Sequence, residues 1–370
     1  MMSHAAGNMC SGIHRRNFLG GAMACGAVAL SGRAMGADAM ITPTKTRYID
    51  VHHHFMTPRS VEETRDRFMI EVTGMEKPQS TLLQWTVEKS LAEMDKAGVE
   101  TAMLSLNSPG LFAGTPEGNR ALARHVNEYA ARAQADHPGR FGHFASLPLA
   151  DTEGALREIV YALDVLKADG FVVRTSDEDR WHGDPSYWPV YEELNRRKAV
   201  LFVHPASALC CQKMNYAFPP AIIEYPFDTT RAITNWIFSG AAARFPDIRL
   251  IYTHGGGSTL MVQDRLEAFA KVRPDLGERL PQGKDVMEVI RSHFYDTALV
   301  YNKPAFAAMR EGLPLSQILF GSDVPYRQLG SEVAALPLLV RDAAEFRAIE
   351  RNNAEALFPR LGQLGMTFEN

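Results

Sequence analysis

Short apolar runs alternate with longer amphipathic stretches along most of this chain. Eight runs rich in aliphatic and aromatic residues predict buried strands at residues 47–51, 101–106, 141–147, 170–174, 199–203, 250–253, 294–297 and 317–320. The intervening segments predict helices at 82–97, 121–135, 152–167, 186–197 and 229–243, followed by a helical tail at 331–357. Strands separated by helices pair in parallel, with both faces of the sheet covered. The pattern therefore predicts a (β/α)₈ TIM barrel. An open doubly wound sheet is less favoured, because no Gly-rich phosphate loop follows the first strand.

The first 39 residues differ from the rest of the chain. A twin arginine, Arg15-Arg16, precedes a short and weakly apolar run at 21–30, and Ala37-Asp38-Ala39 offers a cleavage site. This stretch resembles a bacterial twin-arginine export signal. We therefore expect a signal at residues 1–39, one barrel domain at 40–370, and export to the periplasm by the twin-arginine machinery. The alternative is an N-terminal extension in which the two arginines occur by chance.

Composition argues against several classes of function. The chain is 46% hydrophobic and 22% charged, which is ordinary for a globular protein with a large core. A net charge of -4 gives no electrostatic support for a nucleic-acid partner. The run at 21–30 is shorter than the roughly 20 residues of a membrane-spanning helix, and no later segment predicts a span. The four cysteines lack C-x-x-C spacing, and two of them fall in the expected signal, so neither a disulfide scaffold nor a cysteine metal site is indicated.

Three consecutive histidines end the first predicted strand. Because alternate side chains of a strand share one face, His52 and His54 are expected to point the same way and His53 the other. Two imidazoles on one face can bind a divalent metal ion. The alternative is a surface histidine cluster.

Polar residues also end other predicted strands, and in a barrel these positions converge on the mouth where active sites lie. The set comprises His52, His54, His204, His254 and Asp323. Any one of them could be a hydrogen-bonded structural residue, but buried polar groups are costly without partners, so the whole set indicates a site. Three imidazoles and a carboxylate suit Zn²⁺, or another divalent metal, with an open coordination position. The fourth histidine would then be available as an acid or base.

The motifs around these residues resemble those of a known family. They are D-x-H-x-H at 50–54, F-V-H-P at 202–205, H-G-G-G at 254–257 and G-S-D-x-P at 321–325. Together they resemble the amidohydrolase superfamily, and within it the aminocarboxymuconate-semialdehyde decarboxylase-like branch. The run E-Y-P-F-D-T-T-R at 224–231 is similar to the 6-methylsalicylate-decarboxylase-like members.

The resemblance, which extends from about residue 49 to 358, implies specific roles. His52, His54, His204 and Asp323 would bind one divalent ion, Zn²⁺ with Mn²⁺ as the alternative, and His254 would be the catalytic base. The fourth predicted strand ends at Arg174 rather than at a lysine, so a lysine-bridged two-metal site is not expected.

The implied reaction is non-oxidative decarboxylation of a small aromatic or unsaturated carboxylic acid, such as a hydroxybenzoate, with Asp323 or His254 supplying the proton. Arg174 and Arg231 are candidates for binding the substrate, and His182 is a candidate pocket residue. The first alternative is a hydrolase of a lactone, amide or ester that uses a metal-bound hydroxide, which an exported location favours. A metal-dependent binding protein with a degenerate site is the second. The resemblance also suggests a homodimer.

Overall fold

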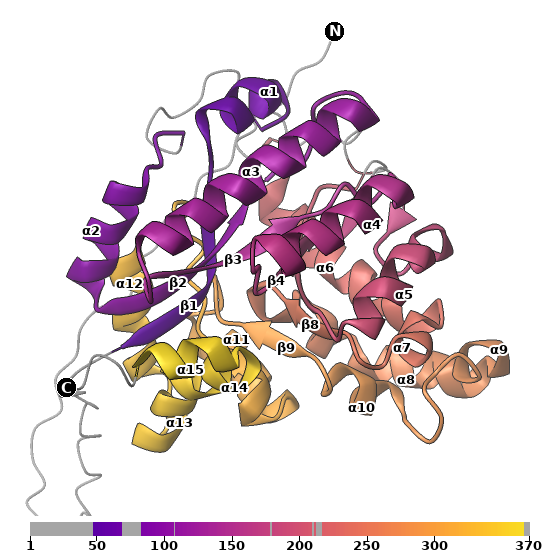
Figure 1. The fold of residues 1–370 in the computed structure, drawn as a ribbon. Coiled ribbons are helices and arrows are strands. Elements are labelled where there is room, and N and C mark those ends of the chain that lie inside the picture. Colours follow the sequence, from indigo (N-terminus) through magenta and orange to yellow (C-terminus); the bar gives the residue numbers. More distant parts are fainter. Residues whose placement is uncertain are drawn as a thin grey trace, which may run out of the picture. The chain divides into compact units, whose positions relative to one another are not determined.

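Eight strands form one parallel sheet in the computed structural model, which describes residues 47–68, 83–106, 108–177, 180–208, 211 and 217–365 (Figure 1). The predicted export signal lies outside these residues. The strands are β1 (Tyr48–Phe55), β2 (Val99–Leu106), β3 (Phe141–Ser146), β4 (Gly170–Arg174), β7 (Val200–His204), β8 (Arg249–Tyr252), β9 (Phe294–Asp296) and β10 (Ile318–Leu319). Each of them overlaps one of the eight predicted strands. A separate antiparallel pair, β5 (Ser176–Asp177) and β6 (Arg180–Trp181), was not predicted.

The sheet follows the order of the chain and closes on itself. Its strand order is β1-β2-β3-β4-β7-β8-β9-β10, without the reversal that a doubly wound sheet requires. The Val51 N–H donates to the Phe320 carbonyl at 3.0 Å, and the His54 N–H donates to the Val324 carbonyl at 2.8 Å. These bonds join the first strand to the segment at the end of the last strand. The predicted (β/α)₈ barrel is therefore confirmed.

Helices lie between the strands and around them (Figure 1). Before β8 they are α1 (Pro58–Phe68), α2 (Val87–Ala97), α3 (Pro116–Asp136), α4 (Thr152–Val160), α5 (Trp188–Arg196), α6 (Ala221–Phe238) and α7 (Ala241–Arg244). After it come α8 (Gln263–Val272), α9 (Pro274–Gly277), α10 (Val286–Ile290), α11 (Lys303–Gly312), α12 (Leu329–Ala335), α13 (Ala343–Arg347), α14 (Asn353–Leu357) and α15 (Pro359–Gly365). No helix in the described part of the chain is both long enough and apolar enough to cross a membrane.

Helix α6 and the tail differ from their predictions. Helix α6 begins at Ala221 rather than near residue 229, because it continues through Pro226, a residue that usually ends or kinks a helix. It ends at Phe238 rather than at 243, since Gly240 adopts a left-handed conformation with φ of 90° before the separate helix α7. The tail is a series of short helices with a break between Leu338 and Ala343.

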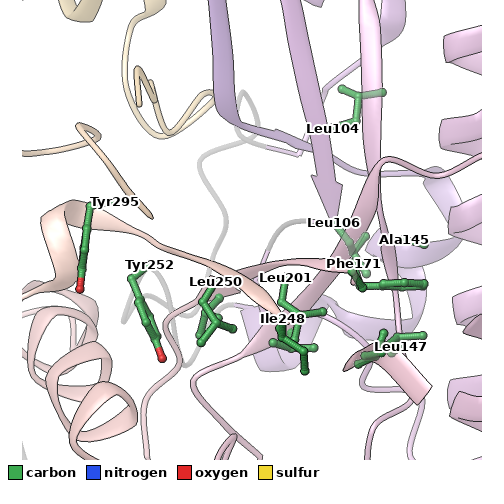
Figure 2. Packing of buried hydrophobic residues seen from close by; sticks show 14 of the residues in the cluster. Leu104, Leu106, Ala145, Leu147, Phe171, Leu201, Ile248, Leu250, Tyr252 and Tyr295 are labelled. Carbon is green, nitrogen blue, oxygen red and sulfur yellow. The ribbon is translucent and has the colours of Figure 1, made fainter. Parts of the chain in front are cut away.

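Two apolar layers build the core. The outer layer lies between the strands and their helices, and Figure 2 shows side chains of neighbouring strands packed beside one another, among them Leu201, Leu250 and Tyr252. The inner layer fills the barrel with residues such as Phe144 and Phe202, whose rings stack with centroids 5.1 Å apart. Side chains of α14 and α15 belong to the same inner layer. The inner layer reaches the histidines, because the His52 ring lies 5.0 Å from that of Phe202.

Candidate metal centre

A local irregularity in β1 turns its histidines toward the barrel. Asp50 pairs with Ala102 and His53 pairs with Leu104, so β1 advances by three residues where β2 advances by two. Such a bulge re-aims side chains and is common beside active sites. His52 and His54 point to the same place, with their Nε2 atoms 3.1 Å apart. The structure therefore agrees with the predicted shared face.

His53 points elsewhere, as predicted. Its Nδ1 lies 3.0 Å from Asp50 Oδ2, and its Nε2 lies 2.7 Å from Ser90 Oγ. Asp50 also accepts hydrogen bonds from the N–H and hydroxyl of Ser322, at 3.0 and 2.6 Å. The Asp50 carboxylate therefore ties β1 to the G-S-D segment that carries Asp323.

Each of the three predicted histidine ligands is oriented through its Nδ1 atom. His52 Nδ1 donates to Asp296 Oδ2 at 2.8 Å, and His204 Nδ1 donates to the Pro205 carbonyl at 3.1 Å. His54 Nδ1 hydrogen-bonds Ser105 Oγ at 3.1 Å. A metal-binding imidazole normally has its second nitrogen fixed in this way. These contacts leave all three Nε2 atoms available to a shared ion.

The four predicted ligands form one compact site. Ligand atoms of His52, His54, His204 and Asp323 all lie within 4.8 Å of one another, and all four residues are buried. Asp323 Oδ1 lies 3.2 Å from the Nε2 atoms of both His52 and His54. His204 Nε2 is buried without a hydrogen-bond partner in the described part of the chain. Buried donor atoms crowded in this way fit a divalent cation, and among the described residues this is the single metal-binding site.

Electrostatics within the site favours a charged Asp323. Burial opposes ionisation, but the imidazoles of His52, His254 and His54 hold the pKa of Asp323 well below its usual range. Burial likewise opposes protonation of His52, yet Asp296 and Asp323 raise the pKa of His52 to about 10. In the metal-free protein, a cation binding at His52 Nε2 must therefore displace a proton.

His254 differs from the three ligand histidines. Neither of its ring nitrogens has a hydrogen-bond partner among the described residues, and its Nε2 lies 3.6 Å from Asp323 Oδ2. Both residues also have left-handed backbones, with φ of 54° for His254 and 64° for Asp323. Side chains other than glycine rarely adopt this conformation, and such strain is concentrated at functional sites. His254 therefore lies beside the four predicted ligands, and its role as the catalytic base stays a prediction.

Asp296 is a site residue that the sequence reasoning missed. It is fully buried at the end of β9, and besides binding His52 its Oδ1 accepts the backbone N–H groups of His254 and Ala298, at 2.9 and 3.1 Å. One carboxylate thus positions a metal ligand and the loop that carries His254. Its position at the end of a predicted strand was the available signal, because the other site residues occupy the same kind of position.

Two cavities adjoin the centre, and Ser108 and His204 line both of them. The larger, of about 690 Å³, is also lined by His254 and Asp323. The smaller, of about 330 Å³, is lined by Arg174 and His182. His254 and Asp323 therefore face the larger cavity, and the predicted substrate-binding residue Arg174 faces the smaller one.

The three predicted substrate-binding residues have different surroundings. Arg174 is the register neighbour of His204 and lies 4.0 Å from the Asp177 carboxylate. His182 is buried, its Nε2 lies 3.2 Å from the Tyr252 hydroxyl, and burial lowers its pKa to about 3, so it is a neutral lining residue.

Arg231 lies in the middle of α6 rather than at a helix start. It pairs with Glu224 at 3.2 Å and Asp228 at 3.7 Å. It is not among the described residues that line either cavity. Its predicted contact with substrate stays a prediction.

Comparison with known proteins gives consistent matches. A family model described as "Amidohydrolase" matches residues 49–360. "Decarboxylase yanB" of Aspergillus niger is 37% identical over 334 residues, which cover 84% of this chain and 87% of that protein. "6-Methylsalicylic acid decarboxylase acuB" of Aspergillus aculeatus is 33% identical over 328 residues, covering 85% and 96%.

Solved structures share the fold. The structure of 5-carboxyvanillate decarboxylase LigW from Sphingomonas paucimobilis superimposes with a TM-score of 0.77 at 23% identity, covering 85% of this chain and 99% of that one. A 5-carboxyvanillate decarboxylase from Novosphingobium aromaticivorans, complexed with manganese, gives a TM-score of 0.76 at 20% identity, covering 85% and 96%.

Proposed function

Because the chain belongs to the amidohydrolase family, we propose that it is a metal-dependent decarboxylase of a small aromatic acid of the hydroxybenzoate type. The observation that carries this proposal is the arrangement of His254 beside an intact three-histidine and one-aspartate centre, facing one cavity. Relatives named as decarboxylases, including one named for 6-methylsalicylic acid, support the reaction class and the substrate class.

The residues of this site can carry out each step of a decarboxylation. A divalent ion bound by the four ligands would act as a Lewis acid toward the carboxylate and a neighbouring hydroxyl of the substrate. His254, on the cavity side of the centre, gives a proton to the ring carbon that carries the carboxylate. The bond from that carbon to the carboxylate breaks, its electron pair restores the aromatic ring, and CO₂ leaves. Asp323 stays ionised throughout, since its pKa is held low, and it orients His254 from 3.6 Å.

Arg174 supplies a positive charge next to His204, in the smaller cavity. Its guanidinium, 18% exposed, lies in the wall of the smaller cavity, on the strand next to that of His204. A cation there attracts an anionic substrate toward the centre. We therefore assign Arg174 to substrate binding, with neutral His182 as a wall of the same cavity.

For the metal, we propose Zn²⁺, with Mn²⁺ as the alternative. Imidazole nitrogens and carboxylate oxygens are donors that bind Zn²⁺, which can expand from four to five ligands to accept a substrate. The manganese in solved relatives of this fold supports the alternative. Elemental analysis of the purified protein, followed by reloading of the chelated protein with each ion, distinguishes the two by which ion restores turnover.

The reaction itself is tested by CO₂ release. The protein loaded with Zn²⁺ or Mn²⁺ is incubated with 6-methylsalicylate and other hydroxybenzoates while CO₂ and the phenol are measured. We expect both products in equal amounts, and none from the chelator-treated protein. Absence of CO₂ from every acid with a stoichiometric metal bound would refute the decarboxylase proposal.

We also propose that residues 1–39 direct export through the twin-arginine machinery to the periplasm. The support is the Arg15-Arg16 pair with its weakly apolar run and small-residue cleavage site. In a bacterial host, replacing both arginines by lysine should keep the protein in the cytoplasm, whereas the unchanged chain reaches the periplasm. Equal fractionation of the two proteins would contradict this assignment.

A homodimer is a further proposal, supported by the resemblance to the family. Sedimentation of the purified protein measures it directly. A mass of one chain at micromolar concentration would contradict it.

A further inference from the structure

The larger cavity has two chemically different ends. Its inner end is the catalytic centre, where His204, His254 and Asp323 contribute to the wall. The rest of its wall, here called the apolar end, is lined mainly by apolar residues from the loop after β8, the segment before α11 and the helices α6 and α11. These are Ala221, Ile222, Pro226, Leu260, Met261, Leu299, Val300, Pro304, Ala305, Ala308 and Met309. Among the described lining residues, Asp323 is the only one with a carboxylate, and none is lysine or arginine.

The cavity is much larger than a simple hydroxybenzoate. A monocyclic acid with one methyl group fills roughly 200 Å³ at the packing density of protein interiors. The cavity measures about 690 Å³, within the range of roughly 300–1,000 Å³ that holds drug-sized ligands. When such an acid places its carboxylate at the centre, most of the apolar end is left over.

Small residues on α11 create this space. Ala305, Ala308 and Met309 all line the cavity, and their spacing of three and four residues places them on one face of the helix. Opposite them, Gly255 has no side chain, and a Cβ at that position would lie 2.9 Å from Met309 Sδ. An alanine-lined wall closed by a flexible methionine suits an apolar ligand of variable length.

The rim of the cavity exposes large apolar side chains. Ile222 is 59% exposed, Met261 70% and Leu299 51%. Apolar side chains gathered around one opening mark a surface that a ligand or partner covers. The rim is continuous with the catalytic centre through a single cavity, which favours a substrate group that extends outward from the reacting ring.

We propose that the preferred substrates are hydroxybenzoates with an alkyl substituent of three or more carbons, and that this substituent occupies the apolar end of the cavity. The inference rests on the proposed function for the identity of the reacting ring. The alkyl group is held by apolar burial alone, and the size of residue 308 limits its length.

Binding of the phenol products tests this inference without turnover or metal. Titration calorimetry on the metal-free protein compares 3-methyl-, 3-propyl- and 3-pentylphenol. We expect the Kd to fall by about fourfold for each added CH₂. The Ala308→Leu variant should bind 3-methylphenol within about twofold of the unchanged protein, but 3-pentylphenol at least tenfold more weakly.

Ala307→Leu is the matched control, because Ala307 lies on the same helix and is also half-buried, but is not among the described residues lining the cavity. It should reproduce the chain-length dependence of the unchanged protein. A Kd that does not depend on chain length would overturn the inference. Equal weakening of methyl- and pentylphenol by Ala308→Leu would also overturn it, since the tail would then bind elsewhere.

Turnover separates this inference from the proposed function. CO₂ release is measured for the 6-methyl, 6-propyl and 6-pentyl salicylates, and kcat/KM should rise with chain length. If 6-methylsalicylate is decarboxylated without a gain for longer chains, the cavity inference fails and the function stands. If no acid releases CO₂ while the phenol series binds as expected, the function fails and the apolar site stands.

Discussion

Replacing Asp296 by asparagine tests how the metal centre is positioned. The Asp296 carboxylate accepts Nδ1–H of His52 on one oxygen and two backbone N–H groups on the other. Asparagine has one acceptor oxygen, which the two backbone donors occupy. Its NH₂ group then faces His52 Nδ1, which must become an acceptor and carry its proton on Nε2. That proton occupies the metal-binding position.

The expected change in metal affinity follows from two opposing effects. Loss of the carboxylate lowers the pKa of His52 from its raised value of about 10, which weakens proton competition with the metal. However, the negative charge of the carboxylate stabilises a bound divalent ion more than a bound proton, because the ion carries two positive charges and the proton one. Loss of orientation adds to this effect, and changes of this kind typically cost 10–100-fold in metal affinity. We therefore expect the metal Kd of Asp296→Asn to rise by about 10–100-fold, or about 1.4–2.7 kcal/mol.

Competition with a chromophoric chelator at fixed pH measures this change. Asp169→Asn is the matched control, because Asp169 is also a well-buried carboxylate but pairs with Arg360 and the His143 N–H, away from the centre. It should lower stability and leave the metal Kd within about twofold of the unchanged protein. An Asp296→Asn protein that binds metal as tightly as the Asp169→Asn control would refute the reasoning.

Three further predictions concern the proton donor His254, a close contact at Gly321 and stability in acid. His254→Asn should keep its metal, because His254 is not a ligand, and lose about 10²–10⁴-fold in kcat; loss of metal in elemental analysis would show that His254 is a ligand instead. Gly321→Ala places a Cβ 2.9 Å from the Cβ of His52, so we expect at least tenfold weaker metal binding in the chelator assay. The control is Gly330→Ala, whose new Cβ would have no atom within 4 Å and which should bind the metal as before. Burial lowers the pKa of His143 to about 4, so the folded protein keeps it neutral while the unfolded chain protonates near pH 6.5. The metal-free protein should therefore lose up to about 1.4 kcal/mol of unfolding free energy per pH unit from this residue as pH falls from 6.5 to 4. Urea unfolding of His143→Phe should show a shallower loss over that range, and an unchanged slope would contradict this assignment.

The sequence predicted the barrel because its signal is local and strong. Strands such as β4 and β7 are nearly continuous apolar runs, as is typical of strands covered on both faces, and the polar residues at strand ends are visible beside these runs. His52, His54, His204 and Asp323 could therefore be brought together from the barrel topology before any distance was known. The pleat also predicted that His53 points away from His52 and His54, although the bulge before them sets which of the two directions is inward.

Other features depend on contacts that no local pattern encodes. The start of α6 was missed because Pro226 normally interrupts a helix, and it is tolerated here inside a packed one. The expected contact of Arg231 with substrate rested on a helix start near that residue. With α6 beginning at Ala221, Arg231 lies in the middle of the helix and pairs with Glu224 and Asp228, and its contact with substrate stays a prediction. The two cavities arise from loops that join at the mouth, and their volumes cannot be read from periodicity.

The centre forms where regular strand geometry is interrupted. In β1 the inward residues are Ile49 and Val51, so strict alternation would send His52 outward. The extra residue between Asp50 and His53 allows Val51 and His52 to face the same interior in succession. His254 and Asp323 reach the centre through left-handed backbones that ordinary strands or helices do not use. Asp50 and Asp296 stabilise these departures by binding backbone N–H groups of His52, Ser322 and His254. Asp50 and Asp296, which are not among the predicted ligands, therefore allow the ligands and His254 to meet.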